Sequence, residues 1–349
     1  MNLFADALSL TAPILQAPMA GSQGHALAAA VCEAGGLGAL PAAMLSPEGL
    51  DAEITALRQH TQRAFNVNFF AHTVPQSDDT QLKRWHQALT PYYQSFGLDP
   101  TQIPQGAGRT PFNAQAAEVI EKHRPAVVSF HFGLPSEDLL ARVKRTGARV
   151  WSSATTVDEA RWLVQHGADA VIAQGLEAGG HRGMFLTDDL TTQVGTMALL
   201  PQIVAAVDVP VIAAGGIADA AGIRAAKALG ASAVQIGTAY LCSPQALTSS
   251  LHRAALRSEA ARHTALTNLF SGRPARGIVN RVMRELGPMS DAAPAFPLAT
   301  AAIAPLRAAA EAQGSGDFSP VWSGQNAPQM QQVSAALITQ GFIDAWRGQ

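Results

Sequence analysis

The chain has 349 residues, of which 48% are hydrophobic and 14% charged, so it can bury a large core and is not disordered. Its net charge is −2 and it has no block of basic residues, which argues against nucleic acid or an anionic membrane as a partner. The N-terminus lacks the basic start of a secretory signal, and no apolar run reaches the length of a membrane span. The only cysteines are Cys32 and Cys242, so neither a disulfide framework nor a cysteine-based zinc site is expected. These features predict a soluble cytoplasmic protein.

Eight short runs that are apolar on both faces recur along the chain, as is typical of buried parallel strands. They lie at residues 14–19, 37–42, 65–70, 126–132, 149–153, 170–174, 210–214 and 233–237.

Amphipathic stretches between several of these runs predict helices. Residues 156–167 begin with Thr156, followed three residues later by Glu159, which is a capping box, and they end in a glycine. Residues 219–230 repeat the pattern with an aspartate as N-cap. The alternation of strands and helices predicts an α/β protein with a (β/α)8 TIM barrel, and a doubly wound open sheet is the alternative.

Two regions exceed the simple repeat and divide the chain into three expected parts. The first is a barrel over residues 1–245 with an insertion at about 71–125. The second, 246–327, is expected to form a helical lid that contacts substrate, beginning with a helical stretch at 245–270. The third, 328–349, is expected to be a closing helix that packs on the barrel.

Glycines follow the seventh and eighth predicted strands, where barrels often bind a phosphate. Paired glycines let the backbone approach an anion closely, and the next helix offers free N–H groups. The expected phosphate contacts are Gly215 and Gly216 after the seventh strand, and Gln235, Ile236, Gly237 and Thr238 after the eighth. The glycines at 35–38 lead from a helix into a strand, which is the wrong context for a Rossmann dinucleotide site.

Other strand ends carry groups able to hold the ring and chain of a flavin mononucleotide. They are Ala17, Pro18 and Met19 after the first strand, Asn68 after the third and Gln174 after the sixth. None of the four lysines falls at a strand end, which argues against Schiff-base chemistry. No histidine and aspartate cluster has the spacing of metal ligands, so no metal is expected.

A glycine-rich loop after the sixth strand contains Gly179, Gly180, His181 and Arg182. At the functional face of a barrel, an imidazole can accept a proton or donate a hydrogen bond to an anionic substrate, so His181 is the expected catalytic residue. His131 after the fourth strand and Arg182 are candidate substrate contacts, and Arg182 or Arg273 is a candidate cation for an acidic substrate.

Several motifs together resemble the nitronate monooxygenase family, formerly 2-nitropropane dioxygenase, of the class I type. They are QAPMAG (16–21), AGGLG (34–38), FNVNFF (65–70), SFHFG (129–133), GLEAGGHRG (175–183), AAGGIAD (213–219) and QIGTAYL (235–241), with SGRPAR (271–276) and VWSGQ (321–325) beyond the barrel.

The resemblance implies non-covalently bound FMN and no metal. It implies detoxifying oxidation of alkyl nitronates by dioxygen, with propionate 3-nitronate as the expected substrate and a carbonyl compound plus nitrite or nitrate as products. Asn68, Gln174, Gly179, Gly216 and residues 235–238 match the FMN contacts. His181 matches the catalytic histidine, which would hold a nitronate anion or act as base for a neutral nitroalkane. A homodimer is a further expectation.

Two alternatives remain from the sequence. One is an FMN-dependent NAD(P)H:quinone reductase or enoyl-acyl carrier protein reductase on the same fold. The other is a barrel that binds a flavin or phosphate without catalysis, against which His181 weighs.

Overall fold

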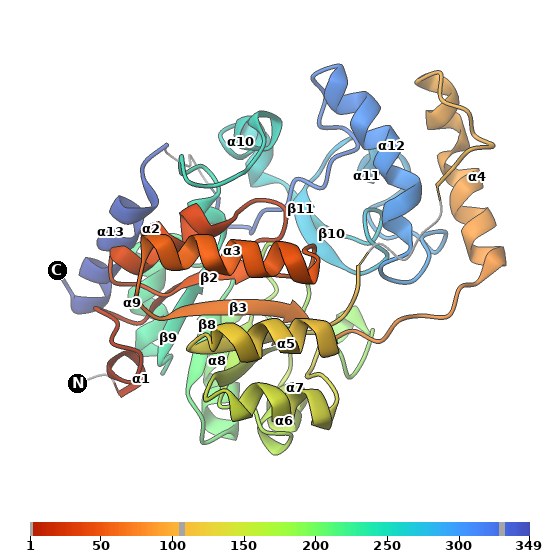
Figure 1. Ribbon diagram of the computed structural model, residues 1–349. Coiled ribbons are helices and arrows are strands. Elements are labelled where there is room, and N and C mark those ends of the chain that lie inside the picture. The colour runs from red at the N-terminus through yellow and green to blue at the C-terminus, as the bar shows by residue number, and fades with distance from the viewer. Residues whose placement is uncertain (1–2, 105–108, 328–331) are drawn as a thin grey trace.

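The computed structural model describes residues 3–104, 109–327 and 332–349. Its main sheet has eight parallel strands, which converge in the middle of the molecule (Figure 1). They are β1 (Ile14–Gln16), β2 (Gly38–Pro41), β3 (Phe65–Phe70), β4 (Val127–His131), β5 (Arg149–Ala154), β6 (Ala170–Gln174), β8 (Val211–Ala214) and β9 (Ala233–Ile236). All eight predicted runs are therefore strands.

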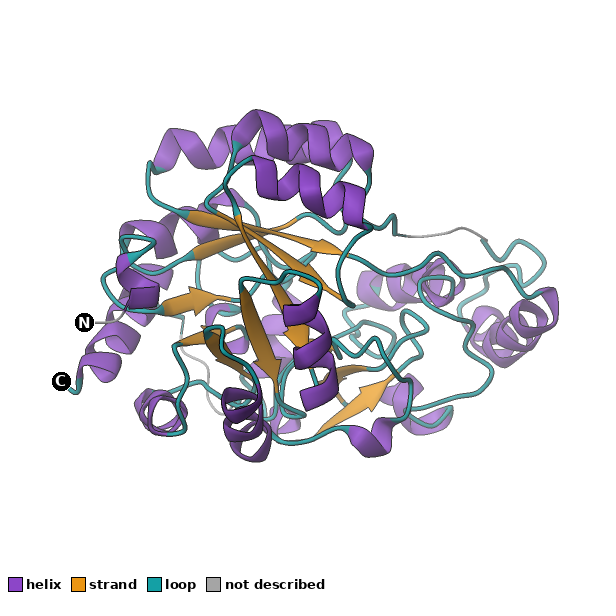
Figure 2. Cartoon of the chain, turned by 90° about the horizontal axis from the view of Figure 1, so that it is seen from below, coloured by secondary structure: helices purple, strands orange, loops and turns teal. Residues whose placement is uncertain are grey.

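The strand order β1-β9-β8-β6-β5-β4-β3-β2 closes on itself, because a parallel bridge joins Leu15 of β1 to Leu37 just before β2. The Gln16 N–H donates to the Leu37 carbonyl at 2.9 Å, and the Leu37 N–H donates to the Ile14 carbonyl at 2.9 Å. The fold is thus a (β/α)8 barrel, as predicted, and the open-sheet alternative is excluded. Figure 2 shows the strands inside a surround of helices.

Eight helices cover the outside of the barrel. They are α2 (His25–Glu33), α3 (Pro47–His60), α5 (Ala114–His123), α6 (Glu137–Arg145), α7 (Val157–Gln165), α8 (Thr196–Ala206), α9 (Ala220–Ala228) and α13 (Ala335–Arg347). The last, α13, packs between α9 and α2 and so occupies the position after β9. The predicted start of this closing helix at residue 328 lies outside the described residues.

Side-chain caps explain where two of these helices begin. The Thr156 hydroxyl accepts from the Glu159 N–H at 3.2 Å before α7, and the Asp219 carboxylate accepts from the Gly222 N–H at 2.8 Å before α9. The Glu159 side chain is fully buried and accepts from both the N–H and the hydroxyl of Thr155, at 2.7 and 2.8 Å. The capping motif therefore joins helix α7 to the end of β5.

Apolar side chains fill the half of the barrel in which its strands begin, which leaves the carboxyl ends of the strands for a site. Leu15, Trp151, Ile172 and Ile212 point inward and pack on Leu8 from the N-terminal segment that contains α1 (Leu3–Asp6). Alternate residues of the same strands pack outward against the helices, as buried parallel strands require.

The predicted insertion at 71–125 divides into two parts. Helix α5 belongs to the barrel, because it packs between α3 and α6. Helix α4 (Asp79–Ser95) instead packs on α12 (Ala299–Ala312), beyond the end toward which β3 points (Figure 1). The Tyr93 hydroxyl donates to the Ala302 carbonyl at 2.7 Å, and the Trp85 indole donates to the Ala299 carbonyl at 3.3 Å. The inserted and appended segments therefore form one body beside the strand ends.

The stretch 245–270 is not one helix, which corrects the prediction. It contains α10 (Ser250–Leu256), a 3-10 turn at Glu259–Arg262 and the strand β10 (Thr264–Thr267). Strand β10 pairs antiparallel with β11 (Ala275–Ile278), and β11 pairs with β7 (Gly180–His181). The remaining elements are α11 (Arg281–Glu285) and the 3-10 turns Leu190–Thr192 and Thr238–Tyr240.

Candidate active site

A cavity opens at the carboxyl ends of the barrel strands and brings most of the predicted site residues together. Its lining includes Ala17, Pro18, Met19, Asn68, His131, Gln174, Gly179, Gly180, His181, Gly215, Gly216, Gln235, Gly237 and Thr238. Ile236 does not line it, because its side chain packs between barrel and helices. Arg182 does not line it either.

The glycine loop after β8 has the geometry expected of an anion cradle. Gly215 and Gly216 have φ of +107° and +71°, values that favour glycine and turn the chain directly before α9. The Glu177 carboxylate accepts from the Thr196 N–H at 2.8 Å, and the Thr196 hydroxyl lies 2.8 Å from the same carboxylate and 2.9 Å from the Gly215 carbonyl, either of which can accept its one proton. Glu177 therefore stabilises this loop through Thr196.

Two buried amides hold the strand ends around the cavity. Asn68 donates to the Ser129 hydroxyl at 2.9 Å. Gln174 donates to the His181 carbonyl at 2.9 Å and accepts from the Gly183 N–H at 2.7 Å. Gln174 thus fixes the loop that carries His181 against the end of β6.

His181 lies on β7, so its backbone is held in a sheet rather than in an irregular loop. Its Nε2 contacts the Ser271 hydroxyl at 2.8 Å, and within the described part of the chain its Nδ1 has no hydrogen-bonding partner. Rings of Phe70, Phe296 and Trp322 lie 6.0, 5.5 and 5.6 Å from its ring. Burial, and then the positive charge of Arg109, lower the pKa of His181 well below its usual range. The imidazole is therefore neutral near pH 7.

His131, the last residue of β4, helps to position the loop that carries His181. Its Nε2 lies 3.0 Å from the His181 carbonyl, and because a carbonyl only accepts, Nε2 carries the proton. Its Nδ1 then accepts from the Ser153 hydroxyl at 3.0 Å. Both ring nitrogens of His131 are therefore occupied by protein partners. Burial lowers the pKa of His131 to about 4, so the ring stays neutral.

Arg182 has a structural role instead of the expected contact with substrate. Its side chain is fully buried, and its guanidinium donates to the carbonyls of Gly175 and Gln174 at 2.6 and 2.8 Å. A third bond goes to the Gln193 amide oxygen at 3.0 Å. Since His181 and Arg182 are consecutive in an extended segment, their side chains point to opposite sides. Arg182 therefore stabilises the loop from the side that faces away from the cavity.

Several cavity residues were not among the predicted contacts, and Arg109, His252 and Asn326 are the polar ones discussed below. Asn326 donates to the Gly216 carbonyl at 3.0 Å, which ties the segment before α13 to the glycine loop. Trp322 had a signal in the VWSGQ motif, whereas Arg109 lies in the inserted segment and had none.

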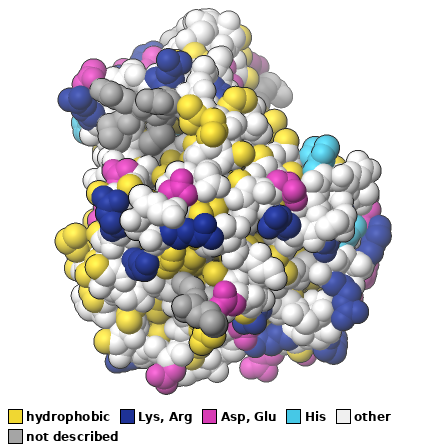
Figure 3. All heavy atoms as spheres, turned by 90° about the vertical axis from the view of Figure 1, so that its left-hand side faces the viewer, with side chains coloured by type: hydrophobic (Ala, Val, Ile, Leu, Met, Phe, Trp, Pro, Cys, Tyr) yellow, Lys and Arg dark blue, Asp and Glu magenta, His cyan; other side chains and the backbone are white. Residues whose placement is uncertain are grey.

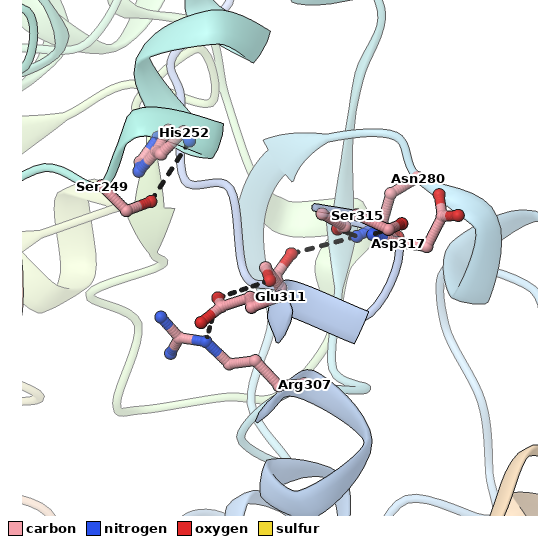
Figure 4. A network of polar contacts seen from close by, with 9 residues as sticks. Ser249, His252, Asn280, Arg307, Glu311, Ser315 and Asp317 are labelled. Atoms are coloured by element: carbon pink, nitrogen blue, oxygen red, sulfur yellow. Dashed lines mark hydrogen bonds and ion pairs between the residues drawn. The ribbon is translucent and has the colours of Figure 1, made fainter. Parts of the chain in front are cut away.

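His252 links helix α10 to the cavity wall. Its ring Nε2 donates to the Trp322 carbonyl at 2.9 Å, and burial lowers the pKa of His252 to about 4. Figure 4 shows this histidine near a second polar group, in which Glu311 accepts from Arg307 and from Ser319, each at 2.7 Å.

The charges on one face of the surface, the lengths of the helices and the spacing of possible metal ligands bear on other kinds of partner. On the face that carries both termini, acidic and basic side chains alternate instead of gathering into one charged patch (Figure 3). No helix in the described ranges combines the length and apolarity needed to cross a membrane. No cluster of three or more His, Cys, Asp or Glu side chains among the described residues could hold a metal ion.

These features define a (β/α)8 barrel with a candidate active-site cavity at the carboxyl ends of its strands. The sequence profile of the family described as nitronate monooxygenase matches residues 2–340. A nitronate monooxygenase of Paraburkholderia phytofirmans is 42% identical over 95% of this chain and 91% of its own, and one of Pseudomonas aeruginosa is 40% identical over 99% of each. A solved structure of nitroalkane oxidase from Streptomyces ansochromogenes has a TM-score of 0.89 and 38% identity, covering 99% of this chain and 98% of its own. The chain belongs to the nitronate monooxygenase family.

Proposed function

We propose that this chain binds FMN at the barrel mouth and oxidises alkyl nitronates with dioxygen, giving a carbonyl compound and nitrite or nitrate. The physiological substrate in this proposal is the toxin propionate 3-nitronate. The observation that carries the proposal is a neutral histidine, His181, which faces the cavity and whose Nδ1 has no partner among the residues that the structure describes. Its setting beside glycine loops and amides supports a flavin site.

The cavity residues fit FMN by their chemistry. Gly215 and Gly216 at the start of α9, with Thr238, offer N–H groups and a hydroxyl to a phosphate. Gly237 has Met19 and Ala17 beside it, and a Cβ there would lie 3.3 Å from the Ala17 side chain, so a larger residue would crowd this wall of the cavity. Asn68 and Gln174 offer amides to the ring and chain.

When bound, FMN would supply the transfer of electrons from substrate to dioxygen. The protein's part is to hold the substrate and move protons. The Ser271 hydroxyl can either accept from or donate to Nε2 of His181. In the first case Nδ1 takes a proton from a neutral nitroalkane, and in the second Nδ1–H donates to a nitronate oxygen. The rings around His181 exclude water from this position.

Oxygen consumption by the purified protein tests the function. We expect uptake with propionate 3-nitronate alone, and none with NADH or NADPH alone. Uptake or flavin bleaching only with a nicotinamide would move the protein to the reductase alternative. The His181→Ala variant is expected to lose at least about 100-fold in kcat/KM, as removal of a general base does. The control is His263→Ala, an exposed histidine outside the cavity. Full turnover by His181→Ala would favour a barrel in which this residue is not catalytic.

Two further parts of the proposal concern the location of the protein in the cell and its oligomeric state. Cys32 and Cys242 are both buried and free, which is consistent with a cytoplasmic location. The homodimer stays a prediction, which analytical ultracentrifugation tests.

A further inference from the structure

Arg109 is the one charged side chain among the described residues that line the cavity, apart from the histidines. Two of those histidines have pKa values of about 4, and that of His181 also lies well below its usual range. The guanidinium of Arg109 stays protonated throughout the working pH range. The cavity therefore carries a single fixed positive charge.

No counter-ion for this charge lies among the described residues. No acidic side chain in the described part of the chain pairs with Arg109, and burial is the cause that lowers the pKa of its guanidinium. Its Nη1 is buried and has no hydrogen-bonding partner among the described residues. A buried, unpaired cation is costly, and an anion in the cavity would remove that cost.

The position of Arg109 separates it from the expected phosphate. Its guanidinium lies 5.8 Å from the ring centre of Phe70, the last residue of β3, and 5.6 Å from that of Phe296. The glycine loop follows β8. In the closed strand order β1-β9-β8-β6-β5-β4-β3-β2, β3 and β8 stand opposite each other across the barrel. Phe70 and Phe296 also flank His181, so Arg109 belongs to the substrate side of the cavity.

We infer that Arg109 binds a carboxylate of the substrate while His181 holds its nitronate group. The inference rests on the proposed function and narrows it to nitronates that carry a second acidic group. An arginine suits this role because its planar fork matches a carboxylate with two parallel hydrogen bonds. Arg109 is then a residue that sets specificity and does not take part in the chemical step.

Phe70, Phe132 and Phe296 pack together as one aromatic cluster. A second arginine beside this cluster, Arg273, provides a matched control. The Arg273 guanidinium lies 4.2 Å from the ring centre of Phe132 and donates to the Met184 carbonyl, but Arg273 does not line the cavity. It has the same charge beside a neighbouring ring, since the ring centre of Phe132 lies 4.9 Å from that of Phe70 and 5.4 Å from that of Phe296, but it does not line the cavity.

The test compares two substrates that differ by one carboxylate: propionate 3-nitronate and propyl-1-nitronate. Oxygen uptake is measured for the wild type and for Arg109→Met, Arg109→Lys and Arg273→Met. For Arg109→Met we expect KM for propionate 3-nitronate to rise about 30-fold, the size of a charge-assisted hydrogen bond, with kcat and the KM for propyl-1-nitronate nearly unchanged. Arg109→Lys should lie between, and Arg273→Met should change neither KM more than about threefold.

A binding measurement without turnover accompanies the rates. Succinate has the two acidic ends of propionate 3-nitronate at a similar spacing, and butyrate has one. Titration of the holoenzyme, followed by flavin absorbance, should show that Arg109→Met weakens succinate about 30-fold and butyrate much less.

Equal loss for both nitronates, no loss for either, or the same selective loss in Arg273→Met would overturn the inference. Failure of the wild type to oxidise any nitronate would instead refute the proposed function. In that case the succinate titration alone decides whether Arg109 binds a carboxylate.

Discussion

The two neighbouring glycines of the His181 loop, Gly179 and Gly180, should respond unequally to the same added methyl group. A Cβ on Gly179 would lie 2.6 Å from the Gly324 nitrogen and 2.6 Å from the Ser323 carbonyl carbon, both backbone atoms. A Cβ on Gly180 would meet nothing within 4 Å, although its φ of +70° is unfavourable for alanine. Gly179→Ala therefore tests close packing, and Gly180→Ala tests backbone conformation alone.

The geometry gives the size of each effect. Ordinary carbon contacts need about 3.5 Å, so Gly179→Ala must push the 323–325 segment away by about 0.9 Å. That displacement breaks the bonds from the Gly324 N–H to the Thr238 hydroxyl, at 3.0 Å, and from the Gln325 N–H to the Glu177 carbonyl, at 2.9 Å. At about 1 kcal/mol each, the loss is about 2 kcal/mol. Gly180→Ala should cost about 1 kcal/mol, the penalty for left-handed backbone.

Two measurements separate the variants. Urea unfolding gives the free energies directly, and titration of the apoprotein with FMN gives the dissociation constant. Because the displaced segment also carries Asn326, which is bonded to Gly216, Gly179→Ala should weaken FMN about 30-fold, while Gly180→Ala should retain wild-type binding. The reasoning is refuted if the two variants bind FMN equally, or if Gly180→Ala is the less stable.

Two further predictions concern buried cationic and titratable groups. Arg182→Met should lower the free energy of unfolding by about 3 kcal/mol in urea, because it removes three buried hydrogen bonds from a charged donor, to the carbonyls of Gly175 and Gln174 and to the Gln193 amide oxygen; unchanged stability would contradict the structural role of Arg182. His252, 8% exposed, is neutral in the fold because its pKa of about 4 lies below the usual 6.5. Its contribution to stability is therefore complete above pH 6.5 and is lost as the pH falls toward 4, by about 2 kcal/mol at pH 5. In His252→Gln, whose amide can still donate to the Trp322 carbonyl, the fall in stability from pH 7 to pH 5 should be smaller by that amount.

The barrel was predictable because its signals are local. Each strand is a short apolar run between turn residues, and Thr156 and Asp219 begin helices through contacts within three residues. The strands β7, β10 and β11 were not predicted, since β7 has only two residues and pairs with β11 far along the chain, and β10 and β11 lie outside the barrel repeat. Such pairing leaves no periodicity to detect.

The site residues also fall into a group that could be predicted from the sequence and a group that could not. Residues at strand ends, such as Asn68, Gln174 and Gly216, could be grouped because the barrel fixes where those ends lie. Arg109 and Asn326 reach the cavity only through the packing of segments outside the barrel repeat, which the sequence does not specify. Arg182 was expected in the cavity from its place beside His181, yet the alternation of side chains in an extended segment turns it the other way.

The pairing of β7 with β11 has a consequence for exchanging parts between related enzymes. The Ala275–His181 register makes the histidine's backbone an edge of a sheet built by a segment 90 residues further on. A chimera that takes the barrel from one relative and the post-barrel segment from another would combine β7 of the first protein with β10 and β11 of the second. These strands would not have been selected to pair with each other. The smallest exchangeable unit therefore comprises residues 175–183, 264–278 and 321–326 together, and the chain's modular boundary does not coincide with the end of its barrel.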